Sequence, residues 1–263
     1  MDLGLQGKRV LITGASRGIG LATALRFAEE GADLFLVARN ATDLNASVSQ
    51  IRSHHNVAVQ SISADLARSE QIDRVVAAAG PIDVLINNAG SIPGGTLDEI
   101  DEARWRQAWD LKVFGYINLT RRVHPQMSDR KSGVIVNVIG MAGERPDAPY
   151  IAGSAGNASL MAFTRALGGT STSYGVRVVG VNPGLVATDR LKSLLRPKAE
   201  KKFGDAERWN EFVDHLPPKR AADPDEIATV VTFLASPRAS YVSGTIVTVD
   251  AGFASCGNIW GAP

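Results

Sequence analysis

The 263-residue sequence has one cysteine, Cys256, and no long apolar run. One cysteine cannot form an internal disulfide or a thiolate metal site. No stretch approaches the roughly 18 apolar residues of a membrane-spanning helix, and the first residues, MDLG, lack the basic start of a signal peptide. The histidines show no metal-ligand spacing; they are His54, His55, His124 and His215. These absences predict a soluble cytoplasmic protein without a metal ion.

The sequence also lacks an excess of charge of either sign. Its 28 Lys and Arg residues against 27 Asp and Glu give a net charge of +1. A balanced chain offers no basic surface for a nucleic acid or an anionic membrane, so neither is expected as a partner. Glycine, in contrast, is abundant, with 26 residues that follow no three-residue period. Many glycines in a sequence that is 44% hydrophobic favour sharp turns and loops close to a ligand.

Short apolar runs alternate with longer helical patterns along the whole chain. Runs without polar alternation are typical of parallel strands buried on both faces, so the pattern predicts a doubly wound, Rossmann-type α/β sheet of about seven strands. We expect a single domain over residues 1–263, with a substrate lid at 190–220. The predicted strands are 9–13, 33–38, 57–61, 83–87, 133–138, 176–182 and 245–249. The predicted helices are 18–30, 42–53, 69–79, 97–127, 154–174 and 224–234.

A glycine-rich segment, Thr13-Gly14-Ala15-Ser16-Arg17-Gly18-Ile19-Gly20, follows the first predicted strand and leads into a helix. Its three glycines permit a tight turn and a close approach of the backbone to a pyrophosphate, while the helix N-terminus supplies unpaired N–H donors. A glycine triplet alone is a weak signal. The strand–turn–helix context makes it a dinucleotide-binding prediction.

Three further motifs follow later strands in order. They are Asp65-Leu66, Asn87-Asn88-Ala89-Gly90, and Pro183-Gly184 with Thr188-Asp189. With the glycine loop they resemble the short-chain dehydrogenase/reductase family over almost the whole chain. That resemblance implies a nicotinamide dinucleotide at the carboxyl ends of the strands. It would be held by Thr13, Gly14, Ser16, Arg17, Gly18, Ile19, Gly20, Arg39, Asp65, Leu66, Asn87, Ala89, Gly90, Pro183, Gly184 and Thr188.

The residues after the second strand indicate which dinucleotide is bound. An acidic residue there would bind the free 2′-hydroxyl of the adenosine ribose, but this chain has Ala38-Arg39-Asn40. Arg39 and Arg17 offer two guanidinium groups to a 2′-phosphate. NADP(H) is therefore favoured over NAD(H).

The four side chains that the family uses for catalysis are absent from the matching positions. The resemblance implies a tyrosine, a lysine four residues later, a serine and an asparagine. Counting without gaps places Gly153, Asn157, Gly140 and Lys112, respectively, at these positions. A lysine and an asparagine have thus exchanged places.

Three interpretations stay open. A slipped alignment would make Tyr150 the family tyrosine, but the lysine position would then fall on Ser154. In a rebuilt site, Tyr150 acts as general acid, Lys112 as its electrostatic partner, and Asn157 lies near the ribose. In the third, redox chemistry is lost, which leaves a dinucleotide-binding protein or a non-redox enzyme. The reciprocal exchange favours the second.

The sequence thus predicts an NADP(H)-dependent oxidoreductase that acts on a small carbonyl or alcohol substrate through an atypical proton-transfer site. The resemblance also implies a homotetramer or homodimer. The predicted lid carries nine basic and five acidic residues among apolar ones, which is typical of amphipathic helices.

Overall fold

Strand β1 lies in the middle of the sheet because both of its faces are apolar. Val10, Leu11 and Ile12 are fully buried, and Val10 lies opposite Leu34 on one side and Val84 on the other. The structure is a computed structural model that describes residues 1–214 and 216–256. Seven strands run parallel, as predicted, and their order in the sheet is β3-β2-β1-β4-β5-β6-β7. They are β1 (Arg9–Thr13), β2 (Asp33–Ala38), β3 (Val59–Ser63), β4 (Val84–Asn87), β5 (Gly133–Val138), β6 (Val176–Pro183) and β7 (Ile246–Val249).

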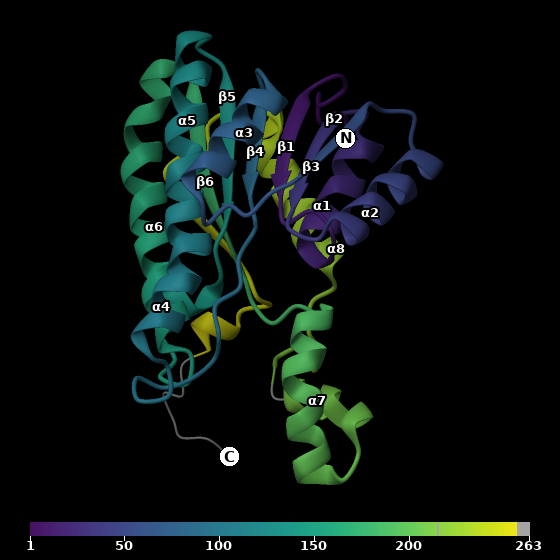
Figure 1. Ribbon diagram of the computed structural model, residues 1–263, viewed down its shortest axis with the longest axis vertical. Coiled ribbons are helices and arrows are strands. Elements are labelled where there is room, and N and C mark those ends of the chain that lie inside the picture. Colours follow the sequence, from purple (N-terminus) through teal and green to yellow (C-terminus); the bar gives the residue numbers. More distant parts are fainter. Residues whose placement is uncertain (215, 257–263) are drawn as a thin grey trace.

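Helices cover both faces of the sheet (Figure 1), which makes the fold the predicted doubly wound one. One core packs α1, α2 and α8 against side chains such as Ile12, while another packs α3 and α5 against Leu11. No helix within the described residues is long and apolar enough to span a bilayer. The helices are α1 (Gly18–Glu29), α2 (Ala41–His54), α3 (Ser69–Ala79), α4 (Glu102–Trp109), α5 (Gly115–Asp129), α6 (Ile151–Ser171), α7 (Asp189–Phe203) and α8 (Pro224–Ala235).

The predicted helix at 97–127 is wrong at both ends and in its interior. Asp101 caps the N-terminus of α4, where its side chain accepts a hydrogen bond from the Arg104 N–H at 2.8 Å, so the helix begins only at Glu102. A π-helical turn, Asp110–Phe114, then separates α4 from α5. Such turns insert an extra residue and are common at functional sites. Lys112 is in the middle of this turn.

The third strand is displaced from the predicted 57–61, because it begins at Val59 and its last residue, Ser63, pairs with Ala38. This strand forms one edge of the sheet, where four of its five residues are exposed or partly exposed. The apolar composition of the segment therefore did not predict the ends of this strand correctly.

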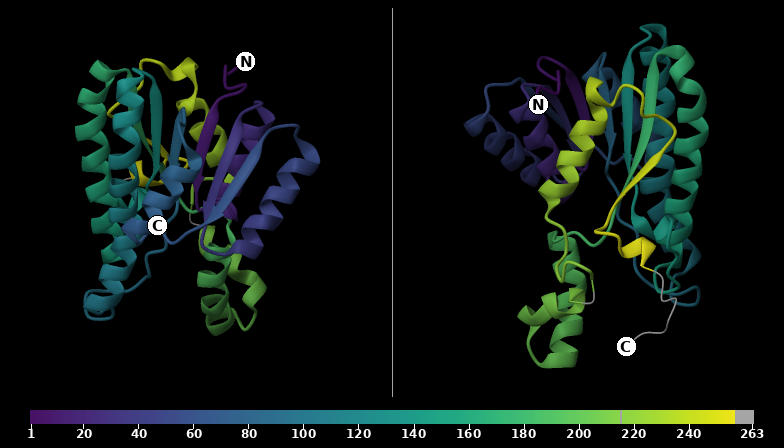
Figure 2. Two further views of the ribbon diagram at one scale, coloured as in Figure 1. Left: turned by 45° about the horizontal axis from the view of Figure 1, so that its top comes forward. Right: turned by 180° about the vertical axis from the view of Figure 1, so that it is seen from behind.

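The carboxyl ends of the strands lie at the bottom of Figure 1, and the predicted lid extends from that end. It consists of α7 and a 3₁₀ segment, Ala206–Val213, that packs against it. Seen from behind, the two form an arm that extends below the body of the sheet (Figure 2). The arm starts one residue after Thr188, whose hydroxyl caps α7 by accepting from the Leu191 N–H.

A buried amide network joins β4 and β5 to the helices behind the site. The Asn87 amide donates to Thr120 at 3.1 Å and to the Asn137 side-chain oxygen at 2.9 Å. Asn137 in turn donates to the Thr164 hydroxyl at 2.9 Å. Buried polar groups that are fully paired specify one arrangement, so this network fixes α5 and α6 relative to the sheet.

Candidate active site

The glycine loop presents free backbone donors at the carboxyl end of β1. Arg17 occupies the N-cap of α1 in an extended conformation, and its side chain caps none of the first N–H groups of the helix. Those groups, from Gly18, Ile19 and Gly20, remain available to an anion. A Cβ on Gly20 would lie 2.1 Å from the Gly14 carbonyl oxygen, so only glycine permits this close packing. The loop therefore fits a dinucleotide pyrophosphate.

Thr13 ties the glycine loop to the loop after β4. Its hydroxyl donates to the Ile86 carbonyl at 3.2 Å and accepts from the backbone N–H groups of Asn88 at 2.8 Å and Ala89 at 3.0 Å. The Asn88 amide returns a bond to the Thr13 carbonyl at 3.0 Å. These bonds hold two predicted cofactor segments side by side.

The structure brings the other predicted cofactor residues to the same edge. Asp65 follows β3, and its carboxylate accepts from the Ala67 N–H at 3.2 Å. Leu66 is buried against the start of α5, and Gly184 follows β6, where a Cβ would lie 2.8 Å from Asp250. The Asn87 side chain differs, because it belongs to the buried amide network and does not face the edge. The remaining members of the set are Ser16, Gly90 and Pro183.

Arg17 and Arg39 are both exposed, and neither belongs to an ion pair between described residues. Arg39 directly follows β2, and the next residue, Asn40, caps α2 by accepting from Thr42 and Asp43. Both guanidinium groups are therefore available to a phosphate. No acidic side chain occupies the end of β2.

Lys112 projects from the π-helical turn toward the end of β5. Its ammonium donates to the Ile139 carbonyl at 2.6 Å and to the Val138 carbonyl at 3.3 Å, and it lies 5.6 Å from the centre of the Tyr116 ring. Burial lowers the pKa of Lys112 to about 7, and the positive charge of Arg190 adds to that drop. An ammonium has three donors, so one remains for a ligand.

Tyr150 fills the space at Gly153. A Cβ on Gly153 would lie 2.0 Å from Cε1 and 2.1 Å from Cζ of the Tyr150 ring, so the ring occupies the start of the path that a side chain at 153 would take. Its backbone is held by a short bridge to Gly95. Burial raises the pKa of the Tyr150 phenol, and Arg190 partly offsets this through its charge and a hydrogen bond. The Tyr150 ring thus enters the space left by the absent side chain at 153, although its hydroxyl reaches less far than that of a tyrosine at 153 would.

Asn157 lies on α6 one turn after Gly153, and it is almost fully buried. A Cβ on Gly140 would lie 2.9 Å from the Asn157 amide nitrogen. The Asn157 side-chain oxygen has no hydrogen-bond partner among the described residues. An unpaired buried acceptor costs about 1–3 kcal/mol. Such an atom fits a ligand hydroxyl or a water molecule.

Arg190, at the start of α7, is the site residue that sequence reasoning missed. Its guanidinium donates to the Gly90 carbonyl at 3.3 Å and to the Ile92 carbonyl. Its positive charge also lowers the pKa of both Lys112 and Tyr150. The sequence placed Arg190 among the nine basic residues of the lid. No signal separated it from the other eight, because the contact joins residues about 100 positions apart.

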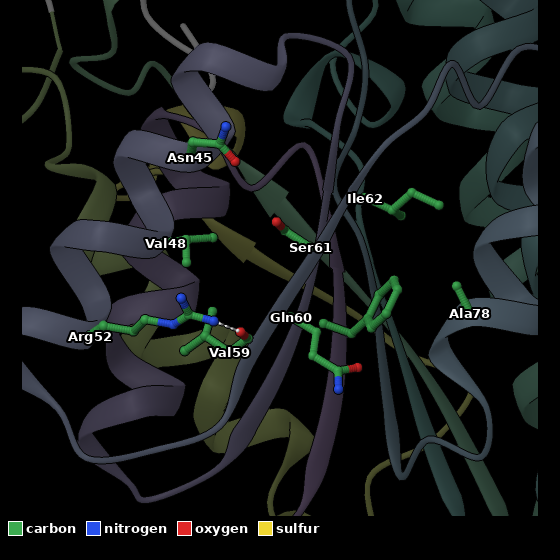
Figure 3. A pocket seen from close by; sticks show the side chains of 9 residues that line it. Asn45, Val48, Arg52, Val59, Gln60, Ser61, Ile62 and Ala78 are labelled. Atoms are coloured by element: carbon green, nitrogen blue, oxygen red, sulfur yellow. Dashed lines mark hydrogen bonds between the residues drawn. The ribbon is translucent and has the colours of Figure 1, made fainter.

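A hollow lies beside the edge strand β3, away from this site (Figure 3). Its one charged side chain is Arg52, which donates to the Val59 carbonyl at 2.5 Å. Its lining has no carboxylate, imidazole or thiol. Its lining consists of Phe35, Asn45, Val48, Arg52, Val59, Gln60, Ser61, Ile62 and Ala78.

Cys256 is an exposed free thiol, and no group of three or more potential metal ligands occurs within residues 1–214 and 216–256. His124 contacts the hydroxyls of Ser171 and Ser128, which gives it a packing role. His215 lies outside the described residues.

Comparisons with known proteins agree with this geometry. Residues 8–199 match the family model described as short chain dehydrogenase. The 7alpha-hydroxysteroid dehydrogenase of Escherichia coli (strain K12) is 33% identical over 255 residues, which are 95% of this chain and 96% of that protein.

Two solved structures share the fold. L-sorbose reductase from Gluconobacter frateurii, complexed with NADPH and L-sorbose, has a TM-score of 0.93 and 33% identity, and the match covers 98% of this chain and 100% of that one. A 7alpha-hydroxysteroid dehydrogenase complexed with NADH and 7-oxo glycochenodeoxycholic acid has a TM-score of 0.84 and 32% identity, with 95% and 96% covered.

Proposed function

Because the chain belongs to the short chain dehydrogenase family, we propose that it is an NADP(H)-dependent oxidoreductase that interconverts a carbonyl and an alcohol. The observation that carries the proposal is the convergence of Lys112, Tyr150 and Arg190 beside a complete dinucleotide loop. The described relatives act on a sugar and on steroids, so the likeness fixes the reaction class and leaves the substrate open.

The preference for NADP(H) rests on the chain's own residues, since one structural relative holds NADPH and another NADH. Arg17 lies in the glycine loop after β1 and Arg39 directly follows β2, where no acidic side chain would repel a 2′-phosphate. The nicotinamide, when bound, supplies or accepts the hydride. The buried oxygen of Asn157 would accept from a ribose hydroxyl.

Tyr150 is the proposed proton donor to the substrate oxygen during reduction. Its raised pKa keeps it protonated at neutral pH, and the neighbouring Arg190 stabilises negative charge that develops beside it. Lys112 would carry a positive charge close to the same centre. With its pKa lowered to about 7, it can take up or release a proton near neutral pH.

One observation favours the competing candidate, a protein that binds the dinucleotide without redox turnover. The Tyr150 ring lies over Gly153, so its hydroxyl ends closer to α6 than that of a tyrosine at 153 would. The test therefore has two readouts. NADPH binding is measured by fluorescence titration, and its oxidation is measured against a panel of sugars, steroids and short oxo acids. Binding without oxidation of any member would support the competing candidate.

A homotetramer or homodimer is part of the proposal. Small residues form an exposed stripe on α6, which would let a second copy approach closely. Gly168 does not belong to this stripe, because it is buried and a Cβ there would lie 2.5 Å from the Gly244 nitrogen. The stripe consists of Ala155, Ala158, Ala162, Ala166 and Gly169.

A further inference from the structure

Arg190 joins the arm to the centre of the site. It is the second residue of α7, and its guanidinium donates to the carbonyls of Gly90 and Ile92 in the loop after β4. The same group lowers the pKa of the Tyr150 phenol through its charge and a hydrogen bond. Arg190 therefore has its charged end at the proposed reaction centre, although the residue as a whole is exposed.

The site holds two cations and no acidic partner for either. No ion pair between described residues includes Arg190 or Lys112. The Glu144 carboxylate, in the loop after β5, is engaged elsewhere, since it accepts from the Thr248 hydroxyl at 2.6 Å and from the Asn182 amide at 3.4 Å. Two positive groups that repel each other favour an anion between or beside them.

Arg190 still has donors to offer such an anion. A guanidinium has five N–H groups in a planar fork; two of its nitrogens donate to backbone carbonyls and one N–H donates to the Tyr150 phenol, so two N–H groups remain. A carboxylate accepts two parallel bonds from such a fork. The N-terminus of α7 has fewer free N–H donors than a phosphate would use, because the Leu191 N–H already donates to the Thr188 hydroxyl.

We propose that the site takes a substrate with a carboxylate close to its reacting carbonyl, and that Arg190 binds this carboxylate. The chemical class is a 2-oxo or 3-oxo acid, or the corresponding hydroxy acid. This inference rests on the proposed oxidoreductase function. It assigns to Arg190 a specificity role that is separate from proton transfer.

The first test compares short 2-oxo and 3-oxo acids with their methyl esters, as substrates of the parent and of Arg190→Gln. The parent should favour the acids in kcat/KM by about tenfold or more, and Arg190→Gln should remove most of that ratio by raising KM for the acids. Lys192→Gln is the matched control, because Lys192 lies on the same helix but contacts Trp209, at 6.0 Å from the ring centre. Its acid-to-ester ratio should equal that of the parent. Equal use of acids and esters by the parent would overturn the inference while leaving the oxidoreductase proposal intact.

The second test does not depend on turnover. Binding of butyrate, butyramide and propyl phosphate to the protein with and without NADPH is measured by calorimetry. Butyrate should bind the parent and Lys192→Gln, and it should bind Arg190→Gln about tenfold more weakly. Butyramide should not displace butyrate from the parent. Butyrate that binds Arg190→Gln as tightly as the parent would contradict the carboxylate assignment. Binding of propyl phosphate without binding of butyrate would contradict it too. Butyrate binding that depends on Arg190, in a protein that oxidises no NADPH, would sink the oxidoreductase proposal and leave this site standing.

Discussion

The ring of Tyr150 lies where the side chain of residue 153 would begin, with 2.0 Å between its Cε1 and the position of a Cβ on Gly153. The absence of a side chain at 153 is thus a condition for the presence of Tyr150 in the site. The phenol at this point of the fold belongs to Tyr150, the N-cap residue of α6.

We expect Gly153→Ala to displace Tyr150. The added methyl would overlap the ring, and overpacking of this kind costs typically about 1–3 kcal/mol of unfolding free energy. Denaturant unfolding measures this loss, and turnover should fall with it. Gly169→Ala is the control, since Gly169 lies on the same helix and a Cβ there would have no atom within 4 Å. It should leave the protein equally or more stable. A Gly153→Ala variant as stable and as active as the parent would show that the ring does not occupy this space.

Lys112 should make stability depend on pH. Its pKa of about 7 in the folded protein lies below the usual 10.5, so between these values the unfolded chain binds more protons and the unfolding free energy rises with pH. The slope cannot exceed about 1.4 kcal/mol per pH unit for one group. Below pH 7 the full cost of burying the charge persists. The other titratable groups facing the ammonium are Arg190 and Tyr116.

Urea unfolding from pH 6 to 10 tests this dependence. Lys112→Met should flatten the rise, whereas Lys198→Met, which removes an exposed lysine of α7, should not. Parallel curves for the parent and Lys112→Met would mean that the ammonium is not desolvated.

Arg17 and Arg39 should set the dinucleotide preference. Replacing Arg39 with Ala removes a charged donor worth about 1.5–3 kcal/mol, so the Kd for NADPH should rise about tenfold or more. NADH binding should change little, because NADH has no 2′-phosphate. Titration of both dinucleotides with the parent, Arg17→Ala and Arg39→Ala gives the comparison. Equal losses for NADPH and NADH would exclude a role in selection.

The small-residue stripe of α6 should lie in a contact between copies. Ala162→Arg places a long charged side chain on this exposed face, so sedimentation should show a smaller assembly than the parent. Far-ultraviolet circular dichroism should be unchanged. If the parent itself sediments as a monomer, the proposed homo-oligomer is wrong.

The sequence predicted the sheet well because apolar β-branched runs mark strands that are buried on both faces. Strands β1, β2 and β5 begin and end as predicted. It failed at the edge strand β3, whose side chains are largely exposed, and in the region 97–127, where Asp101 caps α4 and a π-helical turn interrupts the regular helix period. The motifs located the dinucleotide edge for a similar reason, since they directly follow strands.

The catalytic half of the site was less accessible from the sequence. Counting along the chain predicted that Lys112 and Asn157 have exchanged residue types, which stays a prediction. The ring of Tyr150 over Gly153 and the bonds from Arg190 to Gly90 and Ile92 are three-dimensional contacts that the sequence does not show. Gly140 adds a backbone constraint, because its φ of 138° is one that a serine rarely adopts. A serine at position 140 would therefore be strained.

Single-turnover kinetics with prebound NADPH test the central claim most directly. The parent, Tyr150→Phe and Lys112→Met are mixed with a reducible carbonyl, and loss of nicotinamide absorbance is followed while the Kd for NADPH is measured separately. We expect oxidation by the parent and a loss of about 10²–10⁴ in rate for each variant, with NADPH binding retained. Variants that oxidise NADPH as fast as the parent, or a parent that binds NADPH and reduces no carbonyl, would contradict it.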